Sequence, residues 1–247
     1  MIISVINHTE GELKDDDIQV ALRAVNRQIK EDFEPYWSLG ATLRLEGRST
    51  ARKNSPPVDM RGDAIVYLRA AADSDDALGF HDTHYRGIPC GYVFTEVSDE
   101  LAESWTTTLS HEALELIGDP EVNLLVMGPH PKKPRRNVFH WYEMCDAVQA
   151  ESYKIDEIAV SNFVLPLYFT GTEERGGRND FLGNRHGGRT LRSFGVNPGG
   201  YVGYFDPRTG KHHTHDADDK GLAAERKRIK FRLKAARRGM RYQRFRK

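Results

Sequence analysis

Residues 107–120 read TTLSHEALELIGDP, and the predicted fold is built around this amphipathic segment. Ser98-Asp99-Glu100 predicts the start of its helix, because an N-cap serine followed by acids suits the positive end of the helix dipole. Gly118 and Asp119-Pro120 predict its end. Apolar residues recur between them at helical spacing and indicate one buried stripe: Leu101, Trp105, Leu109 and Leu116.

The same segment carries a candidate metal site. His111 and Glu115 are four residues apart, so on a helix their side chains share one face, with Cβ atoms about 5–6 Å apart. Glu112 stands where zinc proteases with an H-E-x-x-H helix carry the general base, but the second histidine is replaced by Glu115. We predict His111 and Glu115 as metal ligands and Glu112 as the catalytic base. A solvated helix face is the alternative.

A catalytic zinc usually has three protein ligands and one open position for water. The acidic cluster at residues 143–146 could supply the third protein ligand, and we predict Glu143 for this position. Asp119 is the second choice, although a turn role before a proline is equally compatible with its position. Two further acids are candidates: Glu121 and Asp146, the latter also as a hydrogen-bond partner of a ligand. Because carboxylate oxygens are hard ligands that favour oxygen-binding ions, another divalent ion is an alternative to zinc.

The composition fits a globular chain. The 247 residues, 38% of them hydrophobic, suffice for one sizeable domain with an appendage or for two small domains. No apolar run is long enough to span a bilayer. Residues 1–7 are apolar but lack a basic leader and a cleavage site, which predicts a strand and a cytoplasmic or virion-associated protein. Two cysteines, Cys90 and Cys145, argue against a disulfide scaffold.

The net charge of zero conceals an asymmetry. Residues 219–247 hold thirteen Lys and Arg against two acids, so the rest of the chain is acidic. Helically spaced apolar residues predict a basic helical tail that contacts nucleic acid or an acidic protein surface. An anionic membrane surface and a solvated tail are the alternatives. The cations predicted to make these contacts are Arg226, Lys227, Arg228, Lys230, Arg232, Lys234, Arg237 and Arg238.

Hydrophobic patterns predict the element order β-α-β-β-β-β-α up to Leu116. Strands are expected at residues 2–6, 37–45, 63–69, 77–82 and 91–97, and a helix at 15–33 that Pro35 ends. The predicted fold class is α+β, with a mixed sheet backed by two helices. We expect one domain at 1–170, an irregular Gly/Arg-rich segment with a hairpin at 171–218, and the tail at 219–247.

After residue 121 the hydrophobic pattern predicts secondary structure less clearly. Residues 123–136 contain three prolines and the basic run Lys132–Arg136, which predicts a loop, either solvated or in contact with phosphate. Residues 138–148 fit strand or helix, and apolar residues 160–169 are expected in the core. A hairpin is predicted at 200–205 and 211–215. Five histidines are expected to face water, with metal ligation as the alternative: His81, His84, His212, His213 and His215.

Several segments together resemble an uncharacterised family of zincin-like proteins from bacterial and phage genomes. They are FEPYW at 33–37, LGFHD at 78–82, LSHEALELIGDP at 109–120, YEMCD at 142–146 and VSNFVLP at 160–166. The resemblance covers about residues 1–170 and implies a zincin-like fold in which an antiparallel edge strand borders the active site. It also implies metal ligands at His111 and Glu115 and a base at Glu112. Residues 111–121 are further similar to the metzincin pattern H-E-x-x-H-x-x-G-x-x-H/D, with glutamates at two ligand positions.

The resulting expectation is a metal-dependent hydrolase of the peptidase type, acting on a peptide or protein, with a basic tail docked on a partner. Slow turnover or a purely structural ion fits the same ligands. One rival is an assembly protein, for instance of a phage particle, that keeps the fold without catalysis. The other is a nucleic-acid-binding protein that acts through its tail. An oligomer is compatible with each.

Overall fold

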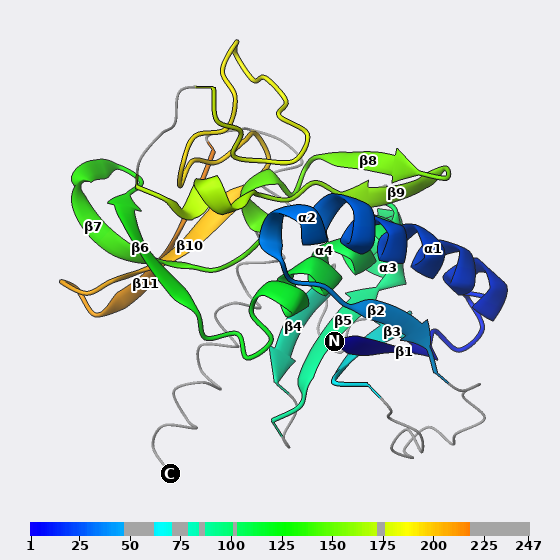
Figure 1. Cartoon of the computed structure of the whole chain (residues 1–247). Coiled ribbons are helices and arrows are strands. Elements are labelled where there is room, and N and C mark those ends of the chain that lie inside the picture. The colour runs from blue at the N-terminus through cyan, green and yellow to red at the C-terminus, as the bar shows by residue number, and fades with distance from the viewer. Residues whose placement is uncertain (47–61, 71–78, 84–86, 101–102, 172–175, 218–247) are drawn as a thin grey trace.

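A computed structural model describes residues 1–46, 62–70, 79–83, 87–100, 103–171 and 176–217 (Figure 1). A five-stranded sheet organises the N-terminal half, in the order β2-β1-β3-β5-β4. Its strands are β1 Ile2–His8, β2 Thr42–Leu45, β3 Ala64–Arg69, β4 Gly79–Thr83 and β5 Pro89–Phe94. Neighbouring strands are parallel except for the edge strand β4, which is antiparallel to β5. The predicted mixed sheet and the α+β class are therefore confirmed.

The first helical segment is longer than predicted. Helix α1, Asp15–Arg27, continues through the π-helical turn η1, Gln28–Phe33, into α2, Glu34–Trp37. Pro35 was expected to end the helix, but it lies in the first turn of α2, where its missing N–H removes no helical hydrogen bond. The segment ends instead at Ser38, which adopts a left-handed conformation with φ of 54°.

The helix that carries the candidate site begins later than predicted. Ser98 lies within a separate short helix, α3, Thr95–Glu100, and donates a hydrogen bond to the Phe94 carbonyl. Helix α4, Trp105–Gly118, starts at the N-cap Ser104, whose hydroxyl accepts from the Thr106 N–H at 3.3 Å. The cap of this helix is therefore Ser104, six residues after the predicted Ser98.

Helix α4 is enclosed on all sides. It lies between the five-stranded sheet and the hairpin formed by β8, Ser152–Ile155, and β9, Ile158–Ser161. Every residue from Thr108 to Gly118 is buried, so the alternative of a solvated helix face is wrong. Ser110 fixes the rotation of the helix, because its hydroxyl donates to the Gln28 side chain at 2.7 Å and accepts from the Ser161 N–H at 2.9 Å.

Apolar side chains of both long helices fill one core with the sheet. Ile18, Leu22 and Val25 of α1 and Leu109 and Leu116 of α4 belong to it. The sheet contributes Ile3, Val5, Val66, Leu68 and Val93 to the same cluster. Two helices therefore back one face of the sheet, as predicted.

A second sheet occupies the other end of the molecule, in the order β11-β10-β7-β6 (Figure 1). Its strands are β6 Leu125–His130, β7 Lys133–Trp141, β10 Tyr201–Asp206 and β11 Lys211–Asp216. The hairpin at β10 and β11 is confirmed. The loop predicted at 123–136 is wrong, because that segment forms the β6–β7 hairpin. Its prolines are tolerated since β6 is an edge strand with a register shift at Pro129, and Pro134 lies at the start of β7.

A smaller core joins the second sheet to the middle of the chain. It contains Ala147 and Val148 of the 3-10 turn η2, Asp146–Val148, with Val164, and it contains Tyr168 of η3, Pro166–Phe169. Leu191 and Val202 complete it from the far side of the predicted boundary at residue 170. The expected burial of residues 160–169 is confirmed for Val160, Phe163, Val164, Leu165 and Tyr168.

The described part of the Gly/Arg-rich segment, residues 176–200, has little regular structure, as predicted. A buried carboxylate orders it instead. Glu151 is 9% exposed and accepts hydrogen bonds from four side chains. The donors are Asn162 and Asn184, each at 2.9 Å, Asn197 at 2.6 Å and His186 at 2.8 Å. Three of these four donors, Asn184, His186 and Asn197, lie within residues 176–200.

Acid is expected to destabilise the fold through His140. This residue is 2% exposed and its Nε2 lies 2.9 Å from the Pro129 carbonyl oxygen. Burial lowers its pKa to about 4, below the ordinary value of 6.5. Above pH 6.5 His140 is neutral in both states and stability does not change. Between pH 6.5 and 4 only the unfolded chain gains the proton, so about 3 kcal/mol of unfolding free energy is lost.

Urea unfolding of the wild type and His140→Gln at pH 7 and pH 4 measures this loss. The variant should lose less stability on acidification, since its amide stays neutral. His8 and His130, whose pKa values burial also lowers, remain in both proteins, so the difference isolates His140. Equal losses in both proteins would contradict the prediction.

Among the described residues, no helix combines the length and the apolar character needed to cross a membrane.

Candidate metal centre

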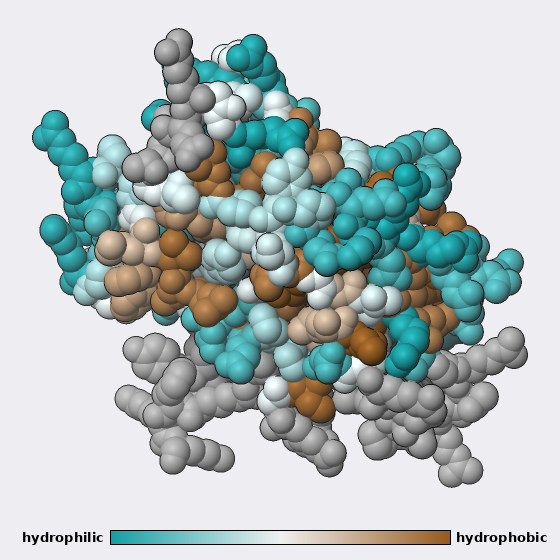
Figure 2. Space-filling view, in the orientation of Figure 1, coloured by the Kyte–Doolittle hydropathy of each residue, from teal (hydrophilic) through white to brown (hydrophobic). Residues whose placement is uncertain are grey.

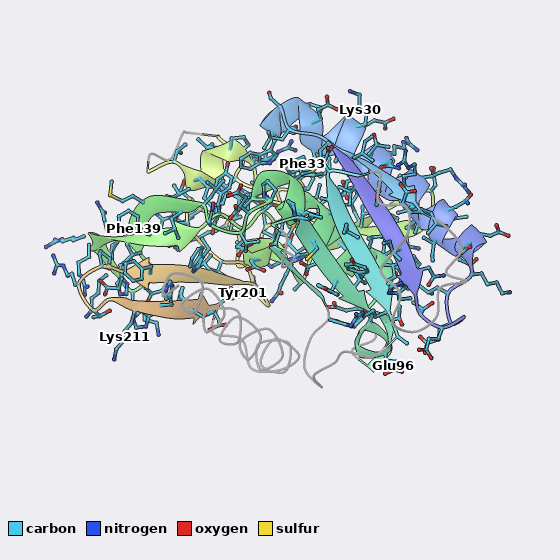
Figure 3. The ribbon with its side chains drawn as sticks, turned by 90° about the horizontal axis from the view of Figure 1, so that it is seen from below. Lys30, Phe33, Glu96, Phe139, Tyr201 and Lys211 are labelled. Carbon is cyan, nitrogen blue, oxygen red and sulfur yellow. The ribbon has the colours of Figure 1, made fainter. Side chains whose placement is uncertain are left out.

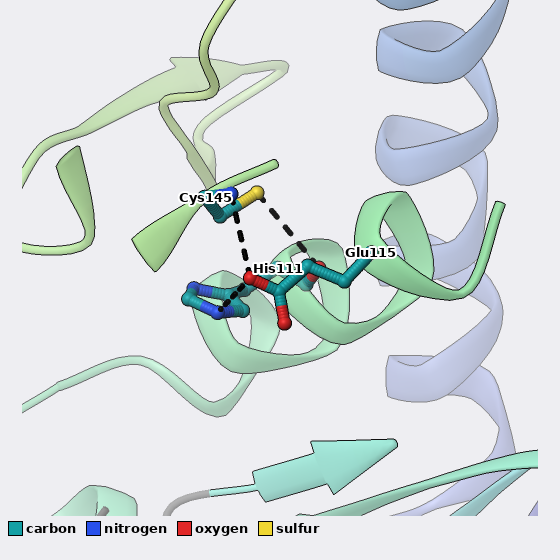
Figure 4. A group of neighbouring side chains, drawn as sticks. All are labelled: His111, Glu115 and Cys145. Carbon is teal, nitrogen blue, oxygen red and sulfur yellow. Dashed lines mark hydrogen bonds and ion pairs between the residues drawn. The ribbon is translucent and has the colours of Figure 1, made fainter. Parts of the chain in front are cut away.

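His111 and Glu115 meet on α4 as their spacing predicts (Figure 4). His111 Nε2 and Glu115 Oε1 are 3.0 Å apart, and the two residues are 5% and 4% exposed. Two polar side chains at this depth are costly unless they hold each other or a shared ion. Their position on an enclosed helix therefore makes them candidates for a metal centre rather than for a surface ion pair.

The segment after β7 brings further ligand atoms to this pair. Asp146 Oδ1 is 3.5 Å from His111 Nε2. The Cys145 N–H donates to Glu115 Oε1 at 3.4 Å, and its thiol donates to the His111 carbonyl oxygen at 3.8 Å (Figure 4). One possible metal-binding group consists of His111, Glu115 and Cys145, and another of Glu115, Glu143 and Asp146. Within each group the ligand atoms lie within 4.8 Å of one another.

Two glycines allow this close approach. A Cβ atom at Gly118 would overlap the Met144 Cε, so the end of α4 packs directly on the side chain between Glu143 and Cys145. A Cβ atom at Gly200 would overlap the Ala147 carbonyl oxygen. The glycines thus bring the end of α4 and the start of β10 against the segment that holds Asp146.

Tyr201 completes the surroundings of the centre, and the sequence analysis did not identify it. This residue is 4% exposed, and its side chain is hydrogen-bonded to Asp146. Burial raises the pKa of its phenol well above 10, and the charges of Asp146, Glu115 and Glu143 raise it further, so it stays protonated. The pair Gly199-Gly200 before a strand indicates a close backbone approach and was the available signal.

The electrostatics of the group favour a bound cation. Glu115, Glu143 and Asp146 place three carboxylate oxygens within 4.8 Å of one another, and Glu115 and Asp146 are almost fully buried. Like charges at this distance in a low dielectric repel strongly, so protons or a positive ion must neutralise some of them. The buried imidazole of His111 offers a nitrogen ligand atom beside them, and nitrogen with carboxylate oxygens is a usual ligand set for a transition metal.

The other predicted ligands do not join the group. Both carboxylate oxygens of Asp119 accept backbone hydrogen bonds, from the Asn123 N–H at 3.1 Å and the Leu124 N–H at 2.9 Å. Its role is therefore to close the turn after α4. Glu121 is exposed and accepts from the Asn123 side chain. Glu112 is 2% exposed on α4, three residues before Glu115, so its side chain borders that of Glu115 on the helix surface.

The remaining predicted site residues lie either outside the possible metal-binding groups or outside the described residues. His212 stacks on Trp141, and His213 stacks on Tyr204. Neither these two nor His215 belongs to a possible metal-binding group in the described ranges. The side chain of His81, the whole of His84 and the eight predicted contact cations between Arg226 and Arg238 lie outside the described residues.

The fold and the site together define an α+β protein with a buried His/Glu/Cys group that could hold a metal ion. The chain matches no protein-family model, and a comparison with curated proteins finds no match.

Proposed function

We propose that the protein binds a divalent metal ion at this centre and acts as a metal-dependent hydrolase of the peptidase type. His111, Glu115 and Asp146 would be the ligands, with Glu143 as a fourth donor. The observation that carries the proposal is the buried convergence of one imidazole and two carboxylates, with His111 Nε2 at 3.0 Å from Glu115 and 3.5 Å from Asp146. The sequence analysis predicted His111, Glu115 and Glu143 as the ligands. The proposed set keeps these three and adds Asp146.

The donor set limits the choice of ion. One nitrogen with two or three carboxylates is a harder ligand set than the histidine-rich sites of most zinc hydrolases, so manganese and ferrous ions compete with zinc. The Cys145 thiol, which is fully buried beside His111, favours zinc if it loses its proton.

The protein's own groups have distinct tasks in such a site. A bound ion would polarise a substrate carbonyl and make an attacking water more acidic. Glu112 would accept the proton of that water and pass it to the leaving amine, since it borders Glu115 on α4. Tyr201 would hold the Asp146 carboxylate in position through its hydrogen bond.

Glu112→Gln tests the assigned base. The variant should keep the metal, because no proposed ligand changes, and should lose hydrolysis by about 10²–10⁴-fold. Metal content by elemental analysis and cleavage of a peptide mixture followed by mass spectrometry measure the two quantities. Glu121→Gln is the matched control, since Glu121 is exposed in the turn after the same helix and the variant should retain both metal and hydrolysis. Unchanged cleavage in Glu112→Gln would refute the base.

A second function is favoured by the burial of the centre. His111, Glu115 and Asp146 are 5%, 4% and 2% exposed, which suits a closed structural ion better than an open catalytic one. The ion would then fasten α4 to the segment 143–146 in an assembly protein without hydrolase activity. Metal content in the wild type without any cleavage of the peptide mixture supports this function over the first.

A further inference from the structure

One face of helix α4 carries four polar side chains. Thr108, His111, Glu112 and Glu115 follow the spacing i, i+3, i+4 and i+7, which brings them to the same side of the helix. We call these four residues the polar face. Each of them is buried, with at most 5% of its surface exposed. The proposed function uses three of them, and Thr108 has no role in it.

The Thr108 hydroxyl is buried without a partner. Thr108 is 5% exposed, and its Oγ1 has no hydrogen-bond partner in the part of the chain that the structure describes. A threonine inside a helix commonly bonds back to the carbonyl group three or four residues earlier, and this hydroxyl does not. Burial of an unpartnered hydroxyl costs free energy that a valine of the same shape would not cost. Packing alone therefore gives no reason for a hydroxyl at this position.

The other buried hydroxyls of α4 have partners. Thr106 is 5% exposed, like Thr108, and donates to the Ala159 carbonyl oxygen at 2.7 Å. The Ser110 hydroxyl makes two hydrogen bonds to other elements. Both side chains thus fasten the helix to its neighbours. The Thr108 hydroxyl does not, so it is available for a ligand.

Glu112 is the neighbour of Thr108 on the polar face. The two residues are one turn apart, with Cβ atoms separated by about 5–6 Å. Side chains on a helix point back toward its N-terminus, so the Glu112 carboxylate is directed over the turn that holds Thr108. A substrate whose leaving nitrogen reaches Glu112 therefore lies beside the Thr108 hydroxyl.

The polar face meets the rest of the chain at the junction of the two sheets. His111 Nε2 is 3.5 Å from Asp146 Oδ1, and Asp146 is hydrogen-bonded to Tyr201. Figure 3 shows Tyr201 at the start of β10, between the second sheet and the five-stranded sheet. The side of the molecule formed by α1 differs, because α1 packs its apolar residues into the core that it shares with α4, and Figure 2 shows mostly hydrophilic residues over it. A substrate would therefore meet the polar face at the junction.

We propose that the Thr108 hydroxyl binds the substrate by accepting a hydrogen bond from the N–H of the scissile peptide bond. This inference rests on the proposed hydrolase function. The hydrogen bond holds the leaving nitrogen beside Glu112, which gives that nitrogen the proton taken from the attacking water as the C–N bond breaks. The substrate class is then a secondary amide. An ester, or a peptide bond that precedes proline, has no N–H for Thr108 to bind.

Thr108→Val tests the proposal on two matched substrates. One is a peptide that the wild type cleaves in the peptide mixture, and the other is its analogue with an ester oxygen in place of the scissile N–H. We expect kcat/KM for the peptide to fall about two- to twelvefold, as for the loss of one neutral hydrogen bond. The value for the ester should not change, because the ester makes no such bond. Thr108→Ser keeps the hydroxyl and should retain most of the activity on the peptide.

The stability of the metal-free protein provides a readout that does not depend on activity. Thr108→Val should keep or raise the urea midpoint, because it removes a buried hydroxyl without a partner. Thr106→Val is the matched control on the same helix, and it should lower the midpoint because the Ala159 carbonyl loses its donor. A purely structural role for Thr108 would lower the midpoint in both variants.

Two results would overturn this proposal and leave the hydrolase function intact. One is a change in kcat/KM in Thr108→Val that is equal for the peptide and the ester, including no change for either. The other is a urea midpoint that Thr108→Val lowers as Thr106→Val does. A metal-loaded wild type that cleaves neither substrate would instead refute the hydrolase function, and the role of Thr108 with it.

Discussion

The purified protein is expected to carry about one divalent ion per chain, and His111→Ala is expected to lose it. His111 provides the single nitrogen of the proposed ligand set, and its Nε2 lies 3.0 Å from Glu115 Oε1 and 3.5 Å from Asp146 Oδ1. Removing it leaves buried carboxylates that can be neutralised only by protons, and a carboxylate-only site holds a transition metal weakly. Elemental analysis after gel filtration, together with titration of the metal-free protein, measures the loss.

Substitution of Asp146 and of Asp119 tests which of these two aspartates is a metal ligand. Asp146→Asn should reduce metal affinity at least about tenfold, because a neutral amide replaces a carboxylate 3.5 Å from His111. Asp119→Asn should keep the ion, because the Asp119 carboxylate is engaged by two backbone N–H groups. The reverse outcome, with the ion lost in Asp119→Asn alone, would show that the ligand set is assigned incorrectly.

Removal of the ion should also lower thermal stability. A ligand at 100 times its dissociation constant stabilises the folded state by about 2.7 kcal/mol. For a chain of this size, that corresponds to a fall in Tm of roughly 5–10 °C on chelation. His111→Ala should show no such fall. A wild-type protein that contains no metal and whose Tm does not respond to a chelator or to added zinc, manganese or ferrous ions would refute the metal centre.

Glu151→Gln is expected to destabilise the protein by about 3 kcal/mol. The carboxylate accepts four hydrogen bonds in a site that is 9% exposed, and hydrogen bonds to a charged group contribute about 1.5–3 kcal/mol each. Glutamine retains the shape but presents an N–H₂ group to donors such as the Asn162 and Asn197 amides. Some donors are then left without an acceptor, and that cost is not recovered elsewhere.

Thermal unfolding by circular dichroism should show a fall in Tm of roughly 6–12 °C. Trypsin should cut the folded variant faster after Arg185, Arg189 and Arg192, because these residues lie in the irregular segment that Glu151 orders. The control is Glu157→Gln, whose side chain is 88% exposed in an ion pair with Lys154 and should change Tm by at most about 2 °C. An unchanged Tm in Glu151→Gln would mean that the polar network contributes little to stability.

The local features of the fold could be predicted from the sequence. The apolar run at residues 63–69 predicted the strand that the structure shows as β3, and the spacing of His111 and Glu115 placed them on one side of a helix. Both inferences depend on helix or strand periodicity alone. The choice between Ser98 and Ser104 as the cap of α4 could not be made in this way, since either serine fits the local rule.

The partners of the metal centre depend on tertiary packing. Asp119 is close to Glu115 in sequence, yet the turn after α4 uses its carboxylate, whereas Asp146 reaches His111 from another element. Tyr201 comes from still farther along the chain. The β6–β7 hairpin was missed for a different reason: its prolines oppose strand formation locally, and they are acceptable because the strand lies at a sheet edge.

The contact between Tyr201 and Asp146 has a consequence for how the protein matures in the cell. At a synthesis rate of about 5–20 residues per second, Tyr201 follows Asp146 out of the ribosome by roughly 3–11 s. During that interval a nascent chain can already form α4 and bring His111 to Asp146, but β10 cannot yet cover them. Before β10 is complete, the ligand atoms of His111 and Asp146 would therefore be more accessible to an ion and to chaperones than in the finished protein.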